Sequence, residues 1–394
     1  MSAARHASAP AAFSEALLCY ERGQLWQACA GLDAVIREDP RHVAAWILSG
    51  VIAGQRRELD AALRAFDRAL AIDPQNASAH FNKANILLLR GEWERGWPHY
   101  EWRWRVPELA AERRSESDGP TLWLGAEGLA GKSILLRGEQ GLGDTLQFCR
   151  YVKCVSGLGA RVILEAQRPL VSLLADLEGV SQILTQGSRA PACDYYCPLM
   201  SLPLAFETTI ENVPQSKPYL TSDTSKVAEW RARLGEAATP RVGLVWRGTA
   251  RRAQDDRRSL PLQTLLAHLP RECQYICMQK ELDAEEARIL RAHPLISTCA
   301  EQLHDFSDTA ALCECLDLVI SIDTSVAHLS GALGKPTWIL LQFSPAWRWL
   351  LDRDDSPWYD SARLFRQPAA GDWDAVCERV ARELRTTLEL ERPR

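Results

Sequence analysis

The N-terminal part of the 394-residue chain repeats with a period of 34 residues. The dipeptide Asp-Pro occurs at 39–40 and again at 73–74. The same interval links two further sets of positions: Ala28, Ala62 and Gly96, and Leu32, Phe66 and Tyr100. Because a unit of this length cannot bury its apolar face alone, the period predicts a stacked array of similar units.

Each repeated unit has the pattern of two amphipathic helices, for example over 44–55 and 58–72. Small residues at the repeating positions let paired helices approach closely, and Pro74 ends the second helix. The pattern resembles the tetratricopeptide repeat, with about three units over 12–105. Such an array forms a concave groove that commonly holds a peptide or another protein. The alternative is that the repeats only brace the next domain of the chain.

Tryptophans are concentrated at the end of the repeats. The segment GEWERGWPHYEWRWR at 91–105 contains four of them: Trp93, Trp97, Trp102 and Trp104. These rings either seal the array against the next domain or, beside arginine, bind a sugar or a nucleobase, and we favour packing. Residues 106–121 are polar and contain proline and glycine, which predicts a linker.

The bulk composition excludes several classes of protein. A net charge of −5 and a pI of about 6.0 argue against non-specific nucleic-acid binding. The sequence has no run of 18 apolar residues and no signal-peptide pattern, so we expect neither a membrane span nor a leader. The twelve cysteines form no C-x-x-C pair. We expect most of them to be small buried residues in a reducing, cytoplasmic setting, with no metal site.

From residue 132, short apolar runs alternate with helical stretches, a pattern that predicts α/β structure with parallel sheets. The predicted strands fall at 132–138, 161–166, 182–184, 241–248, 273–280, 316–323, 336–342 and 362–367. A proline-bearing region and a helix near 223–234 divide them into two halves, over 122–222 and 223–394. Because ligands bind at the carboxyl ends of such strands, the two halves are expected to form a cleft.

A glycine-rich turn comes after the first predicted strand of the first half. The sequence RGEQGLGDTLQ at 137–147 places Gly141, Gly143 and Asp144 between that strand and a helix. The spacing matches neither a dinucleotide fingerprint nor a P-loop. The glycines allow a sharp turn and a close approach of the backbone to a ligand.

One strand end in the second half has the features of an anion site. In SIDTSVAHLSGALGKP at 321–336, Asp323, Thr324 and Ser325 open a helix directly after a buried strand. Backbone N–H groups and the helix dipole attract a phosphate at such a place. His328 lies about one turn further in. Simple helix capping explains the three polar residues equally well.

Two other strand ends carry polar clusters that favour the anion site. Five arginines lie within the segment 246–262: Arg247, Arg251, Arg252, Arg257 and Arg258. Guanidinium groups at this density predict a polyanion nearby. The segment MQKE at 278–281 comes after another strand. We expect a diphosphate on the helix start with Arg258 or Arg247, and a nucleoside facing three residues of that segment: Gln279, Lys280 and Glu281.

Two of these motifs together resemble a known family. DTSVAHLSGALGKP is similar to the donor-diphosphate motif of the ADP-heptose:lipopolysaccharide heptosyltransferases, and RGEQGLGDTLQFCRY is similar to their Gly-Asp element. With the repeats, the resemblance extends over about 12–385 and includes bacterial tetratricopeptide glycosyltransferases, some of which modify proteins such as flagellin. It implies the two-domain GT-B architecture, with an acceptor side at 122–222 and a nucleotide-sugar donor side at 223–394.

The resemblance also implies an inverting, metal-independent transfer that needs no cofactor. Asp144 would take the proton of the acceptor hydroxyl while the nucleoside diphosphate leaves from the opposite face of the anomeric carbon. The helix start at 323–325 and Arg258 would stabilise the departing diphosphate. Arg258 stands where the family has lysine, which keeps the charge but changes the geometry. ADP-heptose is favoured as the donor by resemblance alone, and the acceptor is a protein recruited by the repeats or a saccharide.

Several alternatives stay open on the sequence. The chain is alternatively a repeat scaffold whose transferase part has lost turnover and only binds protein partners. Asp144 is alternatively a helix cap with no part in catalysis. The segment CDYYC at 193–197 either lines the acceptor side or simply packs. A nicotinamide dehydrogenase is disfavoured because the G-x-G-x-x-G turn is absent.

Overall fold

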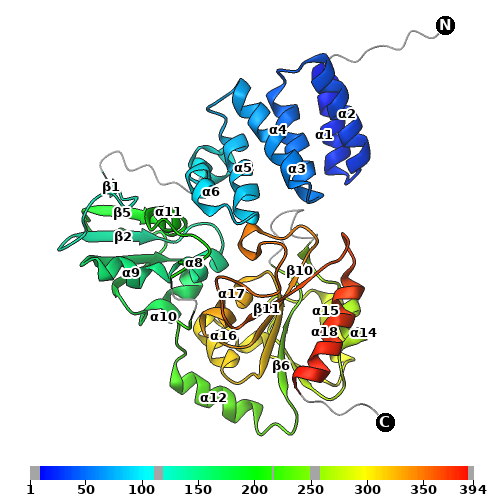
Figure 1. Ribbon diagram of the computed structural model, residues 1–394. Helices are drawn as coiled ribbons and strands as arrows, with labels where there is room; N and C mark the ends of the chain where they lie inside the picture. The colour runs from blue at the N-terminus through cyan, green and yellow to red at the C-terminus, as the bar shows by residue number, and fades with distance from the viewer. Residues whose placement is uncertain (1–8, 111–118, 215–216, 249–257, 389–394) are drawn as a thin grey trace. The chain divides into compact units, whose positions relative to one another are not determined.

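A computed structural model describes residues 9–110, 119–214, 217–248 and 258–388. These residues fall into two units, one helical and one of α/β structure (Figure 1). The helical unit contains the repeats together with the segment Ala346–Leu351, which comes from far along the chain. The α/β unit contains both predicted halves apart from that segment. No helix in the described part of the chain is long and apolar enough to cross a membrane.

The repeats are helices packed in pairs, as the 34-residue period predicts. Their bounds are α1 (Ala9–Glu21), α2 (Leu25–Glu38), α3 (Val43–Gln55), α4 (Leu59–Ile72), α5 (Ala77–Leu89) and α6 (Trp93–Tyr100). Phe66 and the small residue Ala62 on α4 are buried. A Cβ on Gly50 of α3 would lie 2.6 Å from the Phe66 ring, so the pair packs closely because this position carries no side chain.

Two of the four tryptophans at the end of the repeats are packed, as we favoured from the sequence. Trp93 and Trp97 are buried. Trp102 and Trp104 are half-buried, with the guanidinium groups of Arg105 and Arg103 over their respective rings. Trp347, from the distant segment, meets the Trp97 ring edge-on with centroids 5.3 Å apart, an arrangement that aromatic rings prefer. The short helix η1 (Glu101–Arg105) precedes the expected linker, and α7 (Pro107–Ala110) lies within it. Linker residues 111–118 lie outside the described part of the chain.

The first half of the α/β unit is a five-stranded parallel sheet in the order β1-β5-β2-β3-β4. The strands are β1 (Thr121–Leu122), β2 (Ser133–Arg137), β3 (Arg161–Ala166), β4 (Val180–Thr185) and β5 (Tyr195–Pro198). Its helices are α8 (Leu142–Phe148), α9 (Tyr151–Gly157), η2 (Arg168–Leu170), α10 (Val171–Leu174), η3 (Leu199–Ser201) and α11 (Leu202–Ala205). The strand order reverses between β2 and β5, so the glycine-rich turn after β2 lies at a switch point.

The second half is a six-stranded parallel sheet in the order β11-β10-β9-β6-β7-β8. The strands are β6 (Arg241–Val245), β7 (Gln274–Cys277), β8 (Ile296–Thr298), β9 (Leu318–Ile322), β10 (Thr337–Leu341) and β11 (Ala362–Arg366). Within the described residues, the α-helices that accompany the sheet are α14 (Leu262–His268), α15 (Ala284–Arg291), α16 (Phe306–Cys313), α17 (Ser325–Ala332) and α18 (Trp373–Thr387). Figure 1 shows α16 and α17 on one face and α14, α15 and α18 on the other. The helix predicted near 223–234 is α12 (Thr224–Leu234).

Burial explains most of the cysteines. All twelve lie within the described residues as thiols that form no disulfide, and seven of them are buried: Cys149, Cys197, Cys273, Cys277, Cys299, Cys313 and Cys377. Burial raises the pKa of Cys149, Cys277 and Cys313 to about 12, so these thiols stay protonated at neutral pH. The expectation of small buried residues is confirmed for this group.

Candidate functional site

The candidate site lies at the switch point of the second sheet, between β6 and β9. A cavity of about 310 Å³ opens there. It is lined by the residues that come after β6, β7 and β9, by α16, and by Leu142 and Pro169 from the first half. Six of the residues singled out in the sequence line it together: Arg247, Gln279, Lys280, Glu281, Thr324 and Ser325. The fold therefore brings the predicted donor-side strand ends to one cavity.

The start of α17 is open towards this cavity. Thr324 is the N-cap, with extended backbone, and its side chain makes no capping hydrogen bond. Its hydroxyl lies 2.9 Å from the Ser321 hydroxyl instead. Thr324 and Ser325 line the cavity, so the backbone N–H groups of the first turn face a space where an anion can sit.

Asp323 and Arg258 lie beside that helix start. The Arg258 guanidinium Nη1 is 3.4 Å from the Asp323 carbonyl oxygen. A Cβ on Gly248 would lie 2.9 Å from Arg258 Nη2, so the arginine also crosses the end of β6. Three arginines of the same loop, Arg251, Arg252 and Arg257, lie outside the described residues. Arg258 is thus within hydrogen-bonding distance of the residue that follows β9.

Arg247 lines the cavity and is held by a carboxylate of α15. Its Nε and Nη2 donate to the two Glu286 carboxylate oxygens at 2.7 and 2.9 Å, and Nη2 also donates to the Glu281 carbonyl. Trp246 Nε1 donates to the same carboxylate at 2.7 Å. Burial alone would raise the pKa of Glu286, but these hydrogen bonds hold it below its ordinary value. Arg247 therefore fixes α15 against the cavity wall.

The predicted nucleoside-facing segment forms another part of the wall. Gln279 is nearly buried, and its side-chain oxygen accepts from the Arg247 N–H at 3.3 Å. Lys280 donates from Nζ to the His304 carbonyl at 2.9 Å. Both residues and Glu281 line the cavity, which gives it polar groups in an otherwise partly apolar lining.

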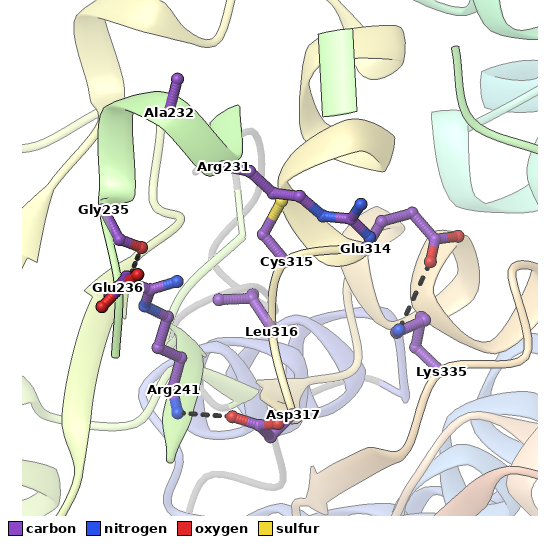
Figure 2. A pocket seen from close by; sticks show the side chains of 10 residues that line it. All are labelled: Arg231, Ala232, Gly235, Glu236, Arg241, Glu314, Cys315, Leu316, Asp317 and Lys335. Carbon is purple, nitrogen blue, oxygen red and sulfur yellow. Dashed lines mark hydrogen bonds and ion pairs between the residues drawn. The ribbon is translucent and has the colours of Figure 1, made fainter. Parts of the chain in front are cut away.

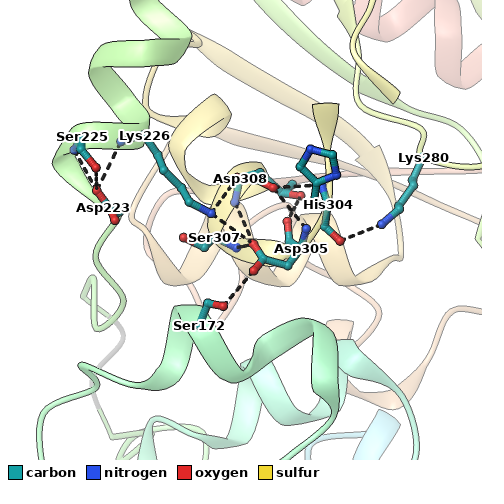
Figure 3. Close-up of polar contacts among 10 residues, drawn as sticks. Ser172, Asp223, Ser225, Lys226, Lys280, His304, Asp305, Ser307 and Asp308 are labelled. Carbon is teal, nitrogen blue, oxygen red and sulfur yellow. Dashed lines mark hydrogen bonds and ion pairs between the residues drawn. The ribbon is translucent and has the colours of Figure 1, made fainter. Parts of the chain in front are cut away.

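Polar contacts hold the part of the cavity wall formed by α16, as Figure 3 shows. Asp305 caps α16 and accepts a hydrogen bond from the Ser172 hydroxyl of the first half at 2.8 Å. Lys226 of α12 donates to Asp308 at 2.7 Å. These bonds join α10, α12 and α16, so both halves and the helix between them meet at this wall.

Asp144 is a capping residue of α8. Its Oδ2 accepts the Gly141 backbone N–H at 2.9 Å, which makes the capping-box contact from the third helical position. Among the described residues, the cavity lining includes Leu142 of the same helix start but not Asp144. The structure thus gives Asp144 a definite folding role, and its catalytic role stays a prediction.

Gly143 and His328 mark the place where α8 and α17 touch. A Cβ on Gly143 would lie 2.7 Å from His328 Cδ2 and 3.4 Å from the Ser325 Cα. His328 is buried, with Nδ1 2.9 Å from the Tyr359 hydroxyl and Nε2 3.7 Å from Asp323 Oδ1. The ring therefore lies within the contact between the halves, and that contact needs a glycine at position 143.

A second, more open hollow lies at the other end of the sheet, near the starts of β6 and β9 (Figure 2). Most of the charged side chains that line it have partners within the protein. Lys335 is 3.4 Å from Glu314, and Asp317 accepts the Arg241 backbone N–H at 2.7 Å. The Arg241 guanidinium donates to the carbonyls of Leu234 and Gly235. These pairs leave little charge for a ligand, so we do not place the site there.

The apolar part of the cavity lining was not predicted from the sequence. It consists of Leu142, Pro169, Met278, Leu303, Phe306 and Val326, among others. Phe306 comes directly after Asp305, whose capping box with Asp308 was the available signal for a helix start there. No group of three or more His, Cys, Asp or Glu side chains within the described residues could hold a metal ion. Metal independence of the site stays a prediction.

Comparison with known proteins identifies the repeats and the fold. Two family profiles of the tetratricopeptide repeat match residues 13–77 and 65–97. Protein FlbA of Caulobacter vibrioides is 29% identical over 358 residues, which cover 83% of this chain and 59% of that protein. The chain thus spans less than two thirds of the length of this relative.

Two solved structures are similar to the chain. A glycosyl transferase family 9 structure from Veillonella parvula has a TM-score of 0.50 at 12% identity, covering 68% of this chain and 100% of its own. The structure of E. coli ADP-heptose lps heptosyltransferase II has a TM-score of 0.49 at 14% identity, covering 65% and 98%. At 12% identity, the similarity to the Veillonella parvula structure establishes the fold alone. The chain therefore contains tetratricopeptide repeats, and the two parallel-sheet halves that follow them have a fold similar to that of GT-B glycosyltransferases.

Proposed function

We propose that the chain is an inverting glycosyltransferase that moves a sugar from a nucleoside-diphosphate sugar to an acceptor hydroxyl. The observation that carries the proposal is the cavity at the β6/β9 switch point, onto which the open start of α17 faces. An uncapped helix start in a cavity of this size suits a diphosphate, and the polar segment after β7 suits the nucleoside. A heptose is the sugar that the sequence resemblance favours.

The proposed reaction is a single displacement. The acceptor hydroxyl gives its proton to Asp144, its oxygen bonds to the anomeric carbon, and the bond from that carbon to the diphosphate breaks with its electron pair. The N–H groups at the start of α17 and the Arg258 guanidinium meet the charge that develops on the leaving diphosphate. These groups supply the stabilisation that a metal ion gives in other transferases, so the proposed reaction needs no metal.

The Asp144 cap is compatible with a role as base. An ionised carboxylate has two oxygens with about four lone-pair sites, so accepting the Gly141 N–H does not by itself use up its capacity for a proton. The cap also orients the carboxylate, which a general base requires. The repeats would recruit the acceptor, which we propose to be a protein, such as a flagellin-like one, or a saccharide.

A ligand screen tests the proposal directly. The purified chain is heated with ADP, UDP, GDP and CMP and with their sugar conjugates, and melting is followed for each. A ligand at 100 times its dissociation constant adds about 2.7 kcal/mol, which is a visible shift. Stabilisation by one nucleotide and its sugar, together with transfer to an acceptor, supports the enzyme. A folded sample that responds to none of them contradicts the proposal and favours a non-catalytic scaffold.

A further inference from the structure

A buried arginine ties the two α/β halves together. Arg150, between α8 and α9 in the first half, is 1% exposed. Its Nε donates to the Gln147 carbonyl at 2.8 Å, and Nη1 donates to the Trp358 carbonyl of the second half at 2.7 Å. Nη2 donates to the Tyr219 hydroxyl at 3.0 Å, and that hydroxyl donates to the Leu146 carbonyl of α8.

Aromatic rings surround the same guanidinium. The Arg150 Cζ lies 4.7 Å from the ring centroid of Tyr219, 5.3 Å from that of Trp358 and 4.8 Å from that of Tyr359. A desolvated guanidinium over ring faces is held strongly. The three rings form an aromatic cage around Arg150. Because they belong to the second half and to the connection before it, the cage holds the two halves together.

Tyr359 links the cage to the donor side, because it contacts both Arg150 and α17. Its ring packs on α17, where a Cβ at Gly331 would come within 2.6 Å of it. Its hydroxyl lies 2.9 Å from His328 Nδ1, and His328 Nε2 lies 3.7 Å from Asp323 Oδ1. If the hydroxyl donates to Nδ1, the imidazole carries its proton on Nε2, which faces the carboxylate.

His328 then reaches the acceptor side through Gly143. The ring edge fills the place that a side chain at Gly143 would need, with Cδ2 2.7 Å from that position. Gly143 is the residue before Asp144 in the first turn of α8. The orientation of one buried ring thus sets how the first turn of α8 lies against the first turn of α17.

We propose that Tyr359 is a positioning residue, which through His328 fixes the acceptor-side turn of α8 against the donor-side turn of α17. This inference rests on the proposed function, in which the proposed base on α8 and the donor diphosphate on α17 must meet at one anomeric carbon. A misplacement of about 1 Å between such groups costs about a hundredfold in rate. Tyr359 would touch neither substrate.

The test removes one hydroxyl. Tyr359→Phe keeps the ring in the cage but removes the hydroxyl that bonds His328 and that also hydrogen-bonds Tyr219. Tyr275→Phe is the matched control. Tyr275 is equally buried, and its hydroxyl donates to the Pro270 carbonyl at 2.7 Å, away from the contact. We expect Tyr359→Phe to lower kcat about 10- to 100-fold with the donor KM within about twofold, and Tyr275→Phe to change neither. Equal kinetics in the two variants would overturn the inference.

Amide hydrogen exchange separates this inference from the proposed function. In the full chain, Tyr359→Phe should raise exchange in the peptide 141–148 about tenfold, although that peptide belongs to the other half, and Tyr275→Phe should not. An unchanged 141–148 peptide overturns the inference whatever the wild-type activity. Absence of any transfer by the wild type, with the exchange change present, contradicts the proposed function but keeps the coupling between the two helix starts. Adding Tyr359→Phe to His328→Ala should cost no further rate if Tyr359 acts only through the His328 ring.

Discussion

The starts of α8 and α17 face each other but are built in different ways. Both helices come after a strand at a switch point of a parallel sheet. At α8 the Asp144 carboxylate accepts a backbone N–H and closes a capping box. At α17 the N-cap Thr324 makes no side-chain cap, and the nearby Asp323 carboxylate lies towards His328.

This difference indicates which helix start suits the donor and which suits the base of the proposed reaction. A carboxylate in the first turn offsets the helix dipole and repels a phosphate, so α8 is unsuited to the donor. An uncapped first turn leaves N–H groups that gain from an anion, so α17 suits the diphosphate. In the proposed reaction, the same fold element therefore serves a proton acceptor in one half and an anion in the other, according to which residue caps it.

The largest effect should come from Asp144→Asn. The amide oxygen can still accept the Gly141 N–H, so the cap and the fold are kept, whereas the proton acceptor is lost. We expect transfer to fall about 10²- to 10⁴-fold while the affinity for the nucleotide is unchanged. Steady-state kinetics and a binding titration check this result. Unchanged turnover would leave Asp144 as a cap only.

Ser325→Pro should have the next largest effect. Ser325 is the first residue of α17, a position where proline preserves a helix but removes its N–H. Thr324 already has the extended backbone that precedes proline comfortably. The loss of one charge-assisted hydrogen bond should weaken nucleoside diphosphate binding about tenfold or more, with the melting temperature nearly unchanged. An unchanged dissociation constant, measured by calorimetry, would place the anion elsewhere.

The fold was predictable mainly where strands are buried. All eight strands predicted from apolar runs are present. Central parallel strands such as β9 and β10 are buried on both faces and so appear as continuous apolar runs, whereas the edge strand β4 has no buried residue and was predicted from a short apolar run alone. Three further strands, β1, β5 and β8, were not predicted. They are short: β1 has two residues, β8 has three, and β5 is the sequence YYCP within a proline-bearing region. Strands of this length carry no periodic signal, and only their pairing in the sheet defines them.

The polar residues of the site were predictable by position, but their partners were not. Turns after strands placed Thr324, Ser325 and the segment after β7 at one sheet edge, and the structure brings them to one cavity. Arg247 is a residue whose partner could not be predicted from the sequence. Its guanidinium looked like a phosphate ligand, but it pairs with Glu286, 39 residues further on. Side-chain pairing over such distances depends on helix placement, which local pattern does not contain. The hydrogen bond from Arg150 to the Trp358 carbonyl could not be predicted for the same reason.

Gly143→Ala tests the contact between the two helix starts. The new methyl group would meet the buried His328 ring at 2.7 Å, and neither helix can move without disturbing the other. We expect a loss of about 1–3 kcal/mol in stability, seen as a lower melting temperature in calorimetry. Gly157→Ala is the control, since a Cβ there meets nothing within 4 Å. Equal melting of the two variants would mean that α8 and α17 are not in close contact.

Glu286→Gln should have the smallest effect, and it tests whether Arg247 is part of the wall or a donor ligand. Glutamine keeps the shape but loses the ion pair with Arg247, so the melting temperature should fall by about 4 °C, from a loss of about 1–2 kcal/mol. Glu285→Gln is the control, because Glu285 pairs with Arg288 at the exposed surface and should change little.

The effect of Glu286→Gln on stability should depend on pH, and the direction follows from the pKa of Glu286. The pKa of Glu286 is lowered by folding, because its hydrogen bonds outweigh the burial that would raise it. The carboxylate therefore contributes stability above its unfolded pKa of about 4.5 and loses it as the pH falls through the folded value. The difference in melting temperature between wild type and Glu286→Gln should be full at pH 7 and shrink below about pH 4.5. Nucleotide affinity should stay within about twofold if the α17 amides hold the anion, whereas tighter binding by Glu286→Gln would mean that a released Arg247 reaches it.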